Sequence, residues 1–108
     1  MNFLVNGYSP NMCFVPNVDI EQRELTLEEF EDESIDAESY IGHDNFATKL
    51  TRELKREIPC NRGNLSLRPG DTLYYACIKG RRLKEGNVRI PKNADIRYFR
   101  LKVKKAII

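Results

Sequence analysis

Five short stretches of the chain are rich in apolar, β-prone residues, and these stretches predict β-strands. The stretch at 73–78 is almost continuously apolar, which is typical of a strand in the middle of a sheet. In the last stretch, Ile96, Tyr98 and Val103 alternate with charged residues, although Phe99 and Leu101 make the alternation imperfect. The expected strands cover residues 3–5, 18–21, 65–67, 73–78 and 96–103.

One stretch has the clear spacing of a helix. Over residues 45–58, apolar side chains recur every three or four residues, which predicts a helix that Pro59 ends. We expect Asp44 to cap the start of this helix, after a tight turn that Gly42 permits. The apolar positions are Ala47, Leu50, Leu54 and Ile58.

An earlier helix is expected to begin after Thr26, because Thr26 and Glu29 have the spacing of a capping box. Turn-forming residues separate the elements at 6–11 and 68–71. The order of strands and helices is mixed, and the helices are too few for a doubly wound sheet. The pattern therefore predicts an α+β fold, with one mixed, mainly antiparallel sheet of about five strands flanked by two or more helices.

The length of 108 residues suits a single domain, residues 1–108, which should bury about 65% of its unfolded surface. No apolar run is long enough to span a membrane, and residues 1–6 look like a strand rather than a targeting signal. The cysteines, Cys13, Cys60 and Cys77, are odd in number and lack metal-ligand spacing. We therefore expect reduced thiols, a cytoplasmic protein, and no metal or cofactor.

The small net charge of +2 hides a division of the chain into an acidic and a basic half. From residue 19 to residue 44 the only base is Arg23, whereas bases outnumber acids from Lys49 onward. The basic half can concentrate an anionic ligand such as a nucleotide. Equally, the two halves can face each other or face water. The acidic residues are Asp19, Glu21, Glu24, Glu28, Glu29, Glu31, Asp32, Glu33, Asp36, Glu38 and Asp44.

The only histidine, His43, is the first candidate for chemistry. Histidine has an unperturbed pKa of about 6.5 and suits proton transfer near neutral pH. His43 should lie at the start of the helix expected over 45–58, where free N–H groups and the helix dipole favour a bound phosphate. The alternative is a surface or half-buried histidine at a helix start. A cysteine nucleophile paired with His43 is also conceivable, although Cys77 lies in an apolar run and is expected to pack.

Three further stretches can carry chemistry, and each has a plainer alternative. Residues 79–86 form a basic segment with two glycines, which can hold guanidinium groups against a phosphate or be a solvated hairpin loop. Residues 6–9 offer amide and hydroxyl donors and a ring that can stack, but turns have the same composition. Residues 60–63 place Arg62 in what can be a plain turn. The sequence contains no P-loop, no dinucleotide glycine fingerprint and no metal-binding carboxylate–histidine motif.

In this order, the stretches resemble the viral ring nucleases, which are anti-CRISPR proteins acting against type III systems. The resemblance covers nearly the whole chain at a similar length. Each motif is weak alone, whereas the ordered set is fairly specific. The motifs are an asparagine-containing loop after the first strand with Asn11-Met12, then Ile41-Gly42-His43-Asp44, Asn61-Arg62 and Arg82-Leu83-Lys84-Glu85-Gly86.

The resemblance implies a metal-independent phosphodiesterase, without a cofactor, that degrades cyclic tetra-adenylate, the second messenger of type III CRISPR effectors. It also implies a homodimer with a five-stranded mixed sheet in each subunit and the ring bound across the dimer. His43 corresponds to the catalytic acid, and Arg82 and Glu85 correspond to the catalytic arginine and glutamate. Ligand-binding residues are expected among Asn6, Gly7, Ser9, Asn11, Gly42, Asp44, Asn45, Arg62 and Arg81.

The chain departs from the family pattern at three places. Asn45 and Phe46 follow the Gly-His-Asp motif, where typical members have small hydroxyl residues. The arginine loop has an extra residue, so either Arg81 or Arg82 can occupy the family position, and the spacing to Glu85 favours Arg82. Residues 91–94 replace a later helix of the archaeal viral members.

Two other classes of function stay open. The first is a binding-only module, a sponge for a cyclic nucleotide or RNA. The second is a protein–protein adaptor whose acidic segment 28–38 binds a basic partner. The presence of His43 together with Arg82 and Glu85 favours the enzyme. Such an enzyme should act in the cytoplasm of a host cell, without a membrane or a stable duplex nucleic acid as its partner.

Overall fold

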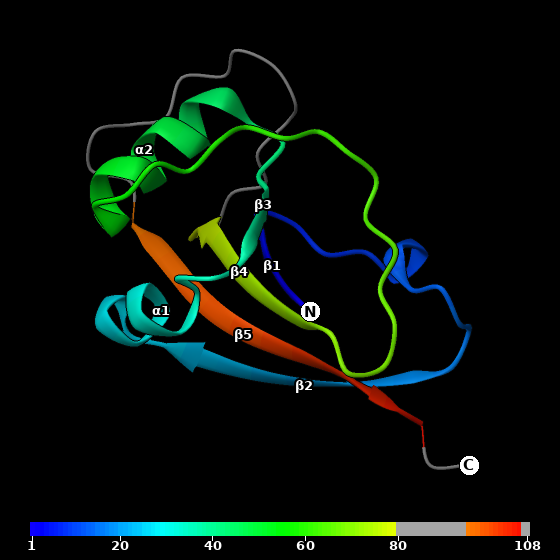
Figure 1. Cartoon of the computed structure of the whole chain (residues 1–108). Helices are drawn as coiled ribbons and strands as arrows, with labels where there is room; N and C mark the ends of the chain where they lie inside the picture. The colour runs from blue at the N-terminus through cyan, green and yellow to red at the C-terminus, as the bar shows by residue number, and fades with distance from the viewer. Residues whose placement is uncertain (80–94, 107–108) are drawn as a thin grey trace.

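A five-stranded mixed sheet forms the framework of the structure, a computed structural model that describes residues 1–79 and 95–106 (Figure 1). β1 is parallel to β3 and to β4, whereas β5 is antiparallel to β2 and to β4. The spatial order is β2-β5-β4-β1-β3. The expected α+β fold with a mixed sheet is confirmed, and the antiparallel pairings are the longer ones. The strands are β1 (Asn2–Val5), β2 (Val18–Leu25), β3 (Glu38–Tyr40), β4 (Thr72–Ile78) and β5 (Ile96–Lys105).

The apolar run at 73–78 is β4, and it lies in the middle of the sheet as predicted. The strand expected at 65–67 is wrong, because Leu67 forms only an isolated bridge with Cys13. Leu67 is fully buried, because the loop that contains it packs on the sheet. The apolar residues at this position therefore belong to a loop that covers the sheet and not to a strand. β3 was not predicted, since three residues are too few to show a period.

α1 (Leu27–Glu33) begins with the expected capping box. The N–H of Glu29 donates to Thr26 Oγ1 (3.2 Å), and the N–H of Thr26 donates to the Glu29 carboxylate (2.9 Å). A short 3₁₀ helix, η1 (Pro10–Met12), lies in the loop after β1, where the sequence indicated only turns. The capping-box residues Thr26 and Glu29 therefore predicted the start of α1 correctly.

α2 (Asp44–Leu54) differs from the expected helix at both ends. Its N-cap is His43 and not Asp44, because the imidazole accepts the N–H of Phe46 while Asp44 is already helical. At the other end, Lys55 adopts a left-handed conformation with φ 55° and ψ 36°. A left-handed residue breaks the hydrogen-bond ladder, so the helix ends at Leu54, ahead of the proline expected to end it.

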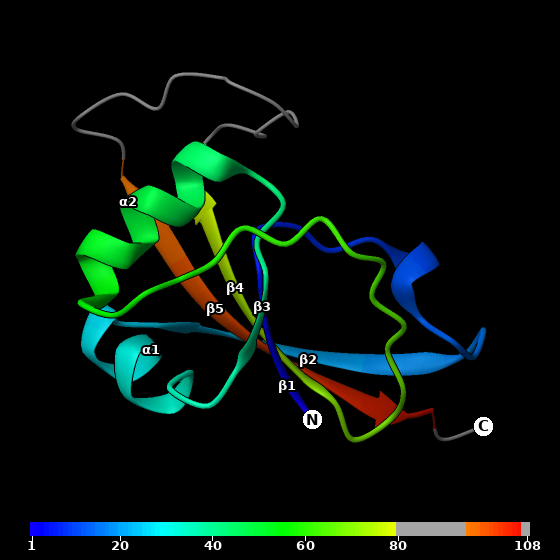
Figure 2. The ribbon, with the colours of Figure 1, turned by 45° about the horizontal axis from the view of Figure 1, so that its top comes forward.

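Both helices pack on one face of the sheet, and loops cover the other face. Figure 2 shows the connection from the end of α2 crossing the molecule to the start of β4. β1 and β4, in the middle of the sheet, are therefore largely buried, whereas β2 at its edge is mostly exposed. The core under the helices includes Leu4, Phe30, Phe46, Leu50, Leu54, Tyr74 and Tyr98. The core under the loops includes Phe3, Val5, Leu67, Leu73, Phe99, Leu101 and Val103.

The acidic and basic parts of the chain meet along β2, α1 and β5. The hydrogen bond from Lys104 holds the pKa of the Glu21 carboxyl group below its ordinary value, and the hydrogen bond from Arg97 does the same for Glu24. Some acidic and basic side chains therefore pair within the domain, in agreement with the interpretation that the acidic and basic halves of the chain face each other. The ion pairs are Glu21–Lys104, Glu24–Arg97 (2.9 Å) and Glu33–Arg100 (2.6 Å).

Replacing Arg56 should destabilise the fold through the end of α1. Its guanidinium group donates to the carbonyls of Glu31 (3.3 Å) and Ser34 (3.0 Å) and to the Ser34 hydroxyl (2.8 Å). Ser34 is fully buried, so its polar groups would lose this donor without gaining water. We expect Arg56→Ala to lower the free energy of unfolding by about 2 kcal/mol in urea titrations. Arg52→Ala, at an exposed position of α2, should change it by less than about 0.5 kcal/mol. Equal effects of the two variants would contradict this role.

Candidate functional site

Three parallel strands end at one edge of the sheet, and segments with candidate residues follow them. β4, β1 and β3 are neighbours, with β1 in the middle. Asn6 follows β1, Gly42 and His43 come shortly after β3, and Lys79 follows β4. Ligands of parallel sheets usually bind beyond the carboxyl ends of the strands. The fold thus brings Asn6, His43 and Lys79, from three separate segments, to the edge where a ligand is expected.

His43 uses one ring nitrogen as the cap of α2. Its Nδ1 accepts the N–H of Phe46 (3.1 Å), and its backbone is extended, with φ −121° and ψ 115°. The side chain is only 1% exposed. Its Nε2 is buried and has no hydrogen-bond partner in residues 1–79 and 95–106. An acceptor nitrogen carries no proton, so this geometry assigns the proton of the neutral ring to Nε2.

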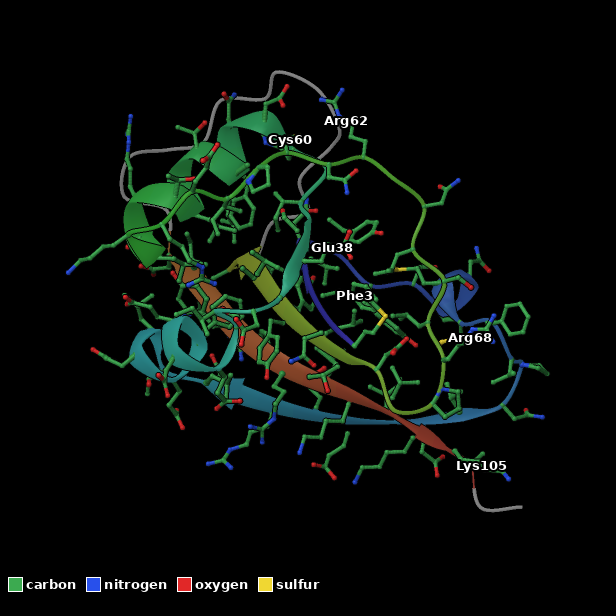
Figure 3. All side chains as sticks on the ribbon, in the orientation of Figure 1. Phe3, Glu38, Cys60, Arg62, Arg68 and Lys105 are labelled. Atoms are coloured by element: carbon green, nitrogen blue, oxygen red, sulfur yellow. The ribbon has the colours of Figure 1, made fainter. Side chains whose placement is uncertain are left out.

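The backbone just before His43 is held from two sides. The N–H of Gly42 donates to Asn6 Oδ1 (3.1 Å), and the Gly42 carbonyl accepts from Nε of Arg62 (2.9 Å). Arg62 also reaches the Asp44 carboxylate (3.4 Å), which offsets the negative charge at the start of α2. Figure 3 shows Arg62 and Cys60 at the end of the molecule where α2 begins.

The segment after α2 runs alongside the segment that leaves β3, and this places Arg62. Ile41 and Cys60 form a parallel bridge, and the N–H of Asn61 donates to the Ile41 carbonyl (2.8 Å). The side-chain amide of Asn61 donates to the Ser39 carbonyl (3.1 Å), while its oxygen accepts the N–H of Gly63 (2.9 Å). A Cβ at Gly63 would lie 3.0 Å from that oxygen, so a larger residue would require the Asn61 side chain to shift by a few tenths of an ångström.

Asn61 is therefore a site residue whose role the sequence did not predict. Its spacing to Gly63 is the signal that was present, because asparagine side chains often bind the N–H two residues on. The bond to Ser39 had no sequence signal, since it joins residues that meet only when β3 and the segment after α2 lie together.

Two cysteines have thiols whose pKa lies above the ordinary value. A hydrogen bond with the Asp44 carboxylate raises the pKa of the exposed Cys60 thiol, and burial raises the pKa of the Cys77 thiol. The thiolate is the reactive form of cysteine, so both side chains are poor nucleophiles. A cysteine nucleophile beside His43 thus finds no support at these two positions.

Removing the Asp44 charge should make Cys60 more reactive. In Asp44→Asn the thiol loses the partner that raises its pKa, so more thiolate is present at about pH 8. We expect alkylation of Cys60 by iodoacetamide to become several-fold faster, as followed by mass spectrometry of the labelled peptide. Cys77 in the same molecule is the internal control and should react at an unchanged rate. A Cys60 rate equal to that of the wild type would contradict the contact.

The structure separates some predicted ligand residues from this edge. Ser9 caps η1 by accepting the N–H of Asn11 (3.4 Å). η1 lies away from the start of α2 in both views (Figures 1 and 2). Gly7 is exposed, with open space where a side chain would begin. Within one chain, the structure therefore does not bring Ser9 or Asn11 to His43.

Of the other residues that the sequence singled out, the structure describes Asn45 and Phe46 but not the arginine segment. Asn45 is exposed in the first turn of α2, whereas Phe46 is fully buried in the core beneath it. Arg81, Arg82 and Glu85 lie outside the described residues. Their segment leaves from Lys79, whose N–H donates to the Asp95 carbonyl (2.9 Å).

Residues 1–79 and 95–106 contain no group of three or more histidine, cysteine or carboxylate side chains arranged to hold a metal ion. Across the same part of the chain, no helix has the length and apolar character needed to cross a membrane. The polar groups gathered at the sheet edge are amide, guanidinium, imidazole and carboxylate groups, which offer both donors and acceptors of hydrogen bonds.

Comparison with known proteins gives a family and a fold. A family model described as STIV B116-like matches residues 2–103. The solved structure of B116 of Sulfolobus turreted icosahedral virus (STIV) is similar, with a TM-score of 0.75 and 23% sequence identity. The match covers 94% of this chain and 97% of that chain. No curated protein matches the chain. At this identity, the structural likeness establishes the fold.

Proposed function

This chain belongs to the STIV B116-like family, and from that premise we propose that it is a metal-independent ring nuclease. Its substrate is cyclic tetra-adenylate, and its product is linear di-adenylate ending in a 2′,3′-cyclic phosphate. Removal of this messenger switches off type III CRISPR signalling, so the protein acts as an anti-CRISPR protein in the host cytoplasm. The choice of substrate comes from the motif resemblance, and the site geometry supports the chemistry.

The single observation that carries the proposal is the double role of His43. One ring nitrogen caps α2, while the other is a buried donor without a partner in the described residues. Leaving a buried donor unpaired costs about 1–3 kcal/mol, so such groups call for an explanation, and a catalytic role is one. A substrate oxygen at Nε2 would supply the missing acceptor.

The chemistry requires little beyond placement and one proton. RNA linkages contain their own nucleophile, the 2′-hydroxyl, so the protein need supply neither a nucleophile nor a metal. The 2′-hydroxyl releases its proton to water as its oxygen attacks phosphorus, and the bond from phosphorus to the 5′-oxygen breaks, which leaves the 2′,3′-cyclic phosphate. His43, charged as an imidazolium, gives its Nε2 proton to the departing 5′-oxygen and becomes neutral, an effect typically worth about 10²–10⁴-fold in rate. Arg82 stabilises the charge on the phosphorane, and Glu85 orients His43.

Two structural consequences follow for His43. Because the ring is almost fully covered, ligand binding must uncover Nε2. A ring protonated at both nitrogens would also make Nδ1 a donor, which is incompatible with accepting the Phe46 N–H. Charging of His43 is therefore linked to the first turn of α2.

We propose a two-fold homodimer as the active assembly. A cyclic tetranucleotide has internal rotational symmetry, so two identical subunits can present the same groups to its two halves. Two His43 side chains then face two phosphodiester bonds. The ring opens first to linear tetra-adenylate and ends as two di-adenylates.

The test is incubation with cyclic oligoadenylates of several ring sizes in excess chelator, with analysis of products over time and light scattering of the protein. We expect cleavage of the four-membered ring, a transient linear tetra-adenylate and a dimer. Binding without cleavage would instead identify a nucleotide sponge. Absence of nucleotide binding would favour the adaptor that uses the acidic segment 28–38.

Arg82 and Arg81 should differ in their contributions to ligand binding. A phosphate contact by a guanidinium group is worth about 1.5–3 kcal/mol, so Arg82→Ala should weaken affinity roughly 10- to 150-fold and slow turnover. Arg81→Ala should have a much smaller effect and serves as the matched control. The measurement is affinity for cyclic tetra-adenylate over a salt titration. If Arg81→Ala is the costlier change, Arg81 occupies the family position.

A further inference from the structure

Both peptide groups of Gly42 are held by side chains from other parts of the chain. Its N–H is bound by the side-chain oxygen of Asn6, which follows β1, and its carbonyl is bound by Arg62, from the segment after α2. These partners lie 36 and 20 residues away in sequence. Two separate parts of the chain thus hold one residue, and that residue immediately precedes His43.

A glycine at this position makes such anchoring necessary. Glycine has the greatest backbone freedom of any residue, so an unanchored Gly42 would let the following residue take many orientations. Its φ lies outside the left-handed region, and a Cβ there would meet only Arg62 Cγ, at 3.7 Å. Other residues could therefore adopt the backbone conformation of Gly42. The hydrogen bonds from Asn6 and Arg62 hold Gly42 in this conformation.

The atoms that bind Gly42 show which parts of the Asn6 and Arg62 side chains are engaged with the protein. Asn6 presents its oxygen, an acceptor, to the protein. Arg62 turns Nε to Gly42 and a terminal nitrogen to the Asp44 carboxylate. Both side chains are thus engaged with the turn that carries His43, where the sequence had suggested contacts with the ligand.

We infer that Asn6 and Arg62 are positioning residues, which act through His43 by fixing the Gly42 peptide groups. The catalytic part of this inference rests on the proposed function. The structural part does not, because the orientation of the His43 ring can be observed without substrate. A positioning residue lowers the rate at saturating ligand, whereas a ligand contact weakens affinity.

The first experiment uses the fact that His43 is the only histidine. Long-range ¹H–¹⁵N spectra at about pH 8, where an unperturbed imidazole is neutral, report the ring nitrogens of this one residue. We expect the wild type to show a single form with its proton on Nε2. Asn6→Ala and Arg62→Ala should show a mixture of tautomers. Asn6→Asp, which keeps the oxygen acceptor, and Arg52→Ala should keep the wild-type spectrum. Unchanged spectra in both alanine variants would overturn the inference.

The second experiment measures single-turnover cleavage of cyclic tetra-adenylate and its dissociation constant. For Asn6→Ala and Arg62→Ala we expect the rate at saturating ligand to fall roughly 10- to 100-fold. The dissociation constant should stay within about threefold of the wild type, and Asn6→Asp should restore the rate. A raised dissociation constant with an unchanged rate would show ligand contacts and overturn the inference. If the wild type does not cleave while the alanine variants change the ring spectrum, the proposed function fails and the positioning of His43 stands.

Discussion

His43→Asn should lower the rate of cyclic tetra-adenylate cleavage by about 10²–10⁴-fold while the protein stays folded. Asparagine has a side-chain oxygen that can accept the Phe46 N–H in place of Nδ1, so the cap of α2 is kept. It has no group that can protonate a leaving oxygen. The measurements are single-turnover cleavage and thermal unfolding of the same preparation.

His43→Ala completes this comparison because it removes both roles at once. It should lose cleavage to the same degree, with affinity for the ring within about tenfold of the wild type. The lost cap should also lower the free energy of unfolding by about 0.5–2 kcal/mol. Full cleavage by the asparagine variant would rule out His43 as the acid and leave it only a structural role.

Phe46→Ala should lower the free energy of unfolding by about 3–5 kcal/mol, the usual range for removing a buried phenylalanine. The side chain is fully buried and packs in the core beneath α2. Small domains are stable by only about 5–15 kcal/mol, so the variant should unfold at a clearly lower urea concentration. Urea titration followed by circular dichroism measures the change.

Thr48→Ala is the matched control, because Thr48 is exposed on the same helix and alanine is a good helix former. It should change the free energy of unfolding by less than about 0.5 kcal/mol. The contrast bears on function, because the family pattern has small hydroxyl residues after the Gly-His-Asp motif. A small effect of Phe46→Ala would mean that this side chain does not fill the core and is available to a ligand.

The sequence predicted some interactions between residues that lie close together along the chain. Thr26 and Glu29 are three residues apart, and their capping box formed as expected. The run at 73–78 predicted the middle strand, because a strand covered on both faces needs apolar residues throughout. The strand predicted at 65–67 was wrong, since a loop that covers a sheet buries side chains just as a strand does.

The sequence by itself determined that His43 stands at the start of a helix near a candidate anion site, but not that it caps the helix. Asp44 is the better capping type, yet its carboxylate faces Arg62, 18 residues away. Likewise, the sequence singled out Asn6 and Arg62, whereas only the tertiary structure joined both to Gly42. The physical reason is that these bonds need β1 and β3 to pair in parallel and the segment after α2 to return beside them. No pattern within a few residues encodes that pairing, because its partners become neighbours only when the sheet has formed.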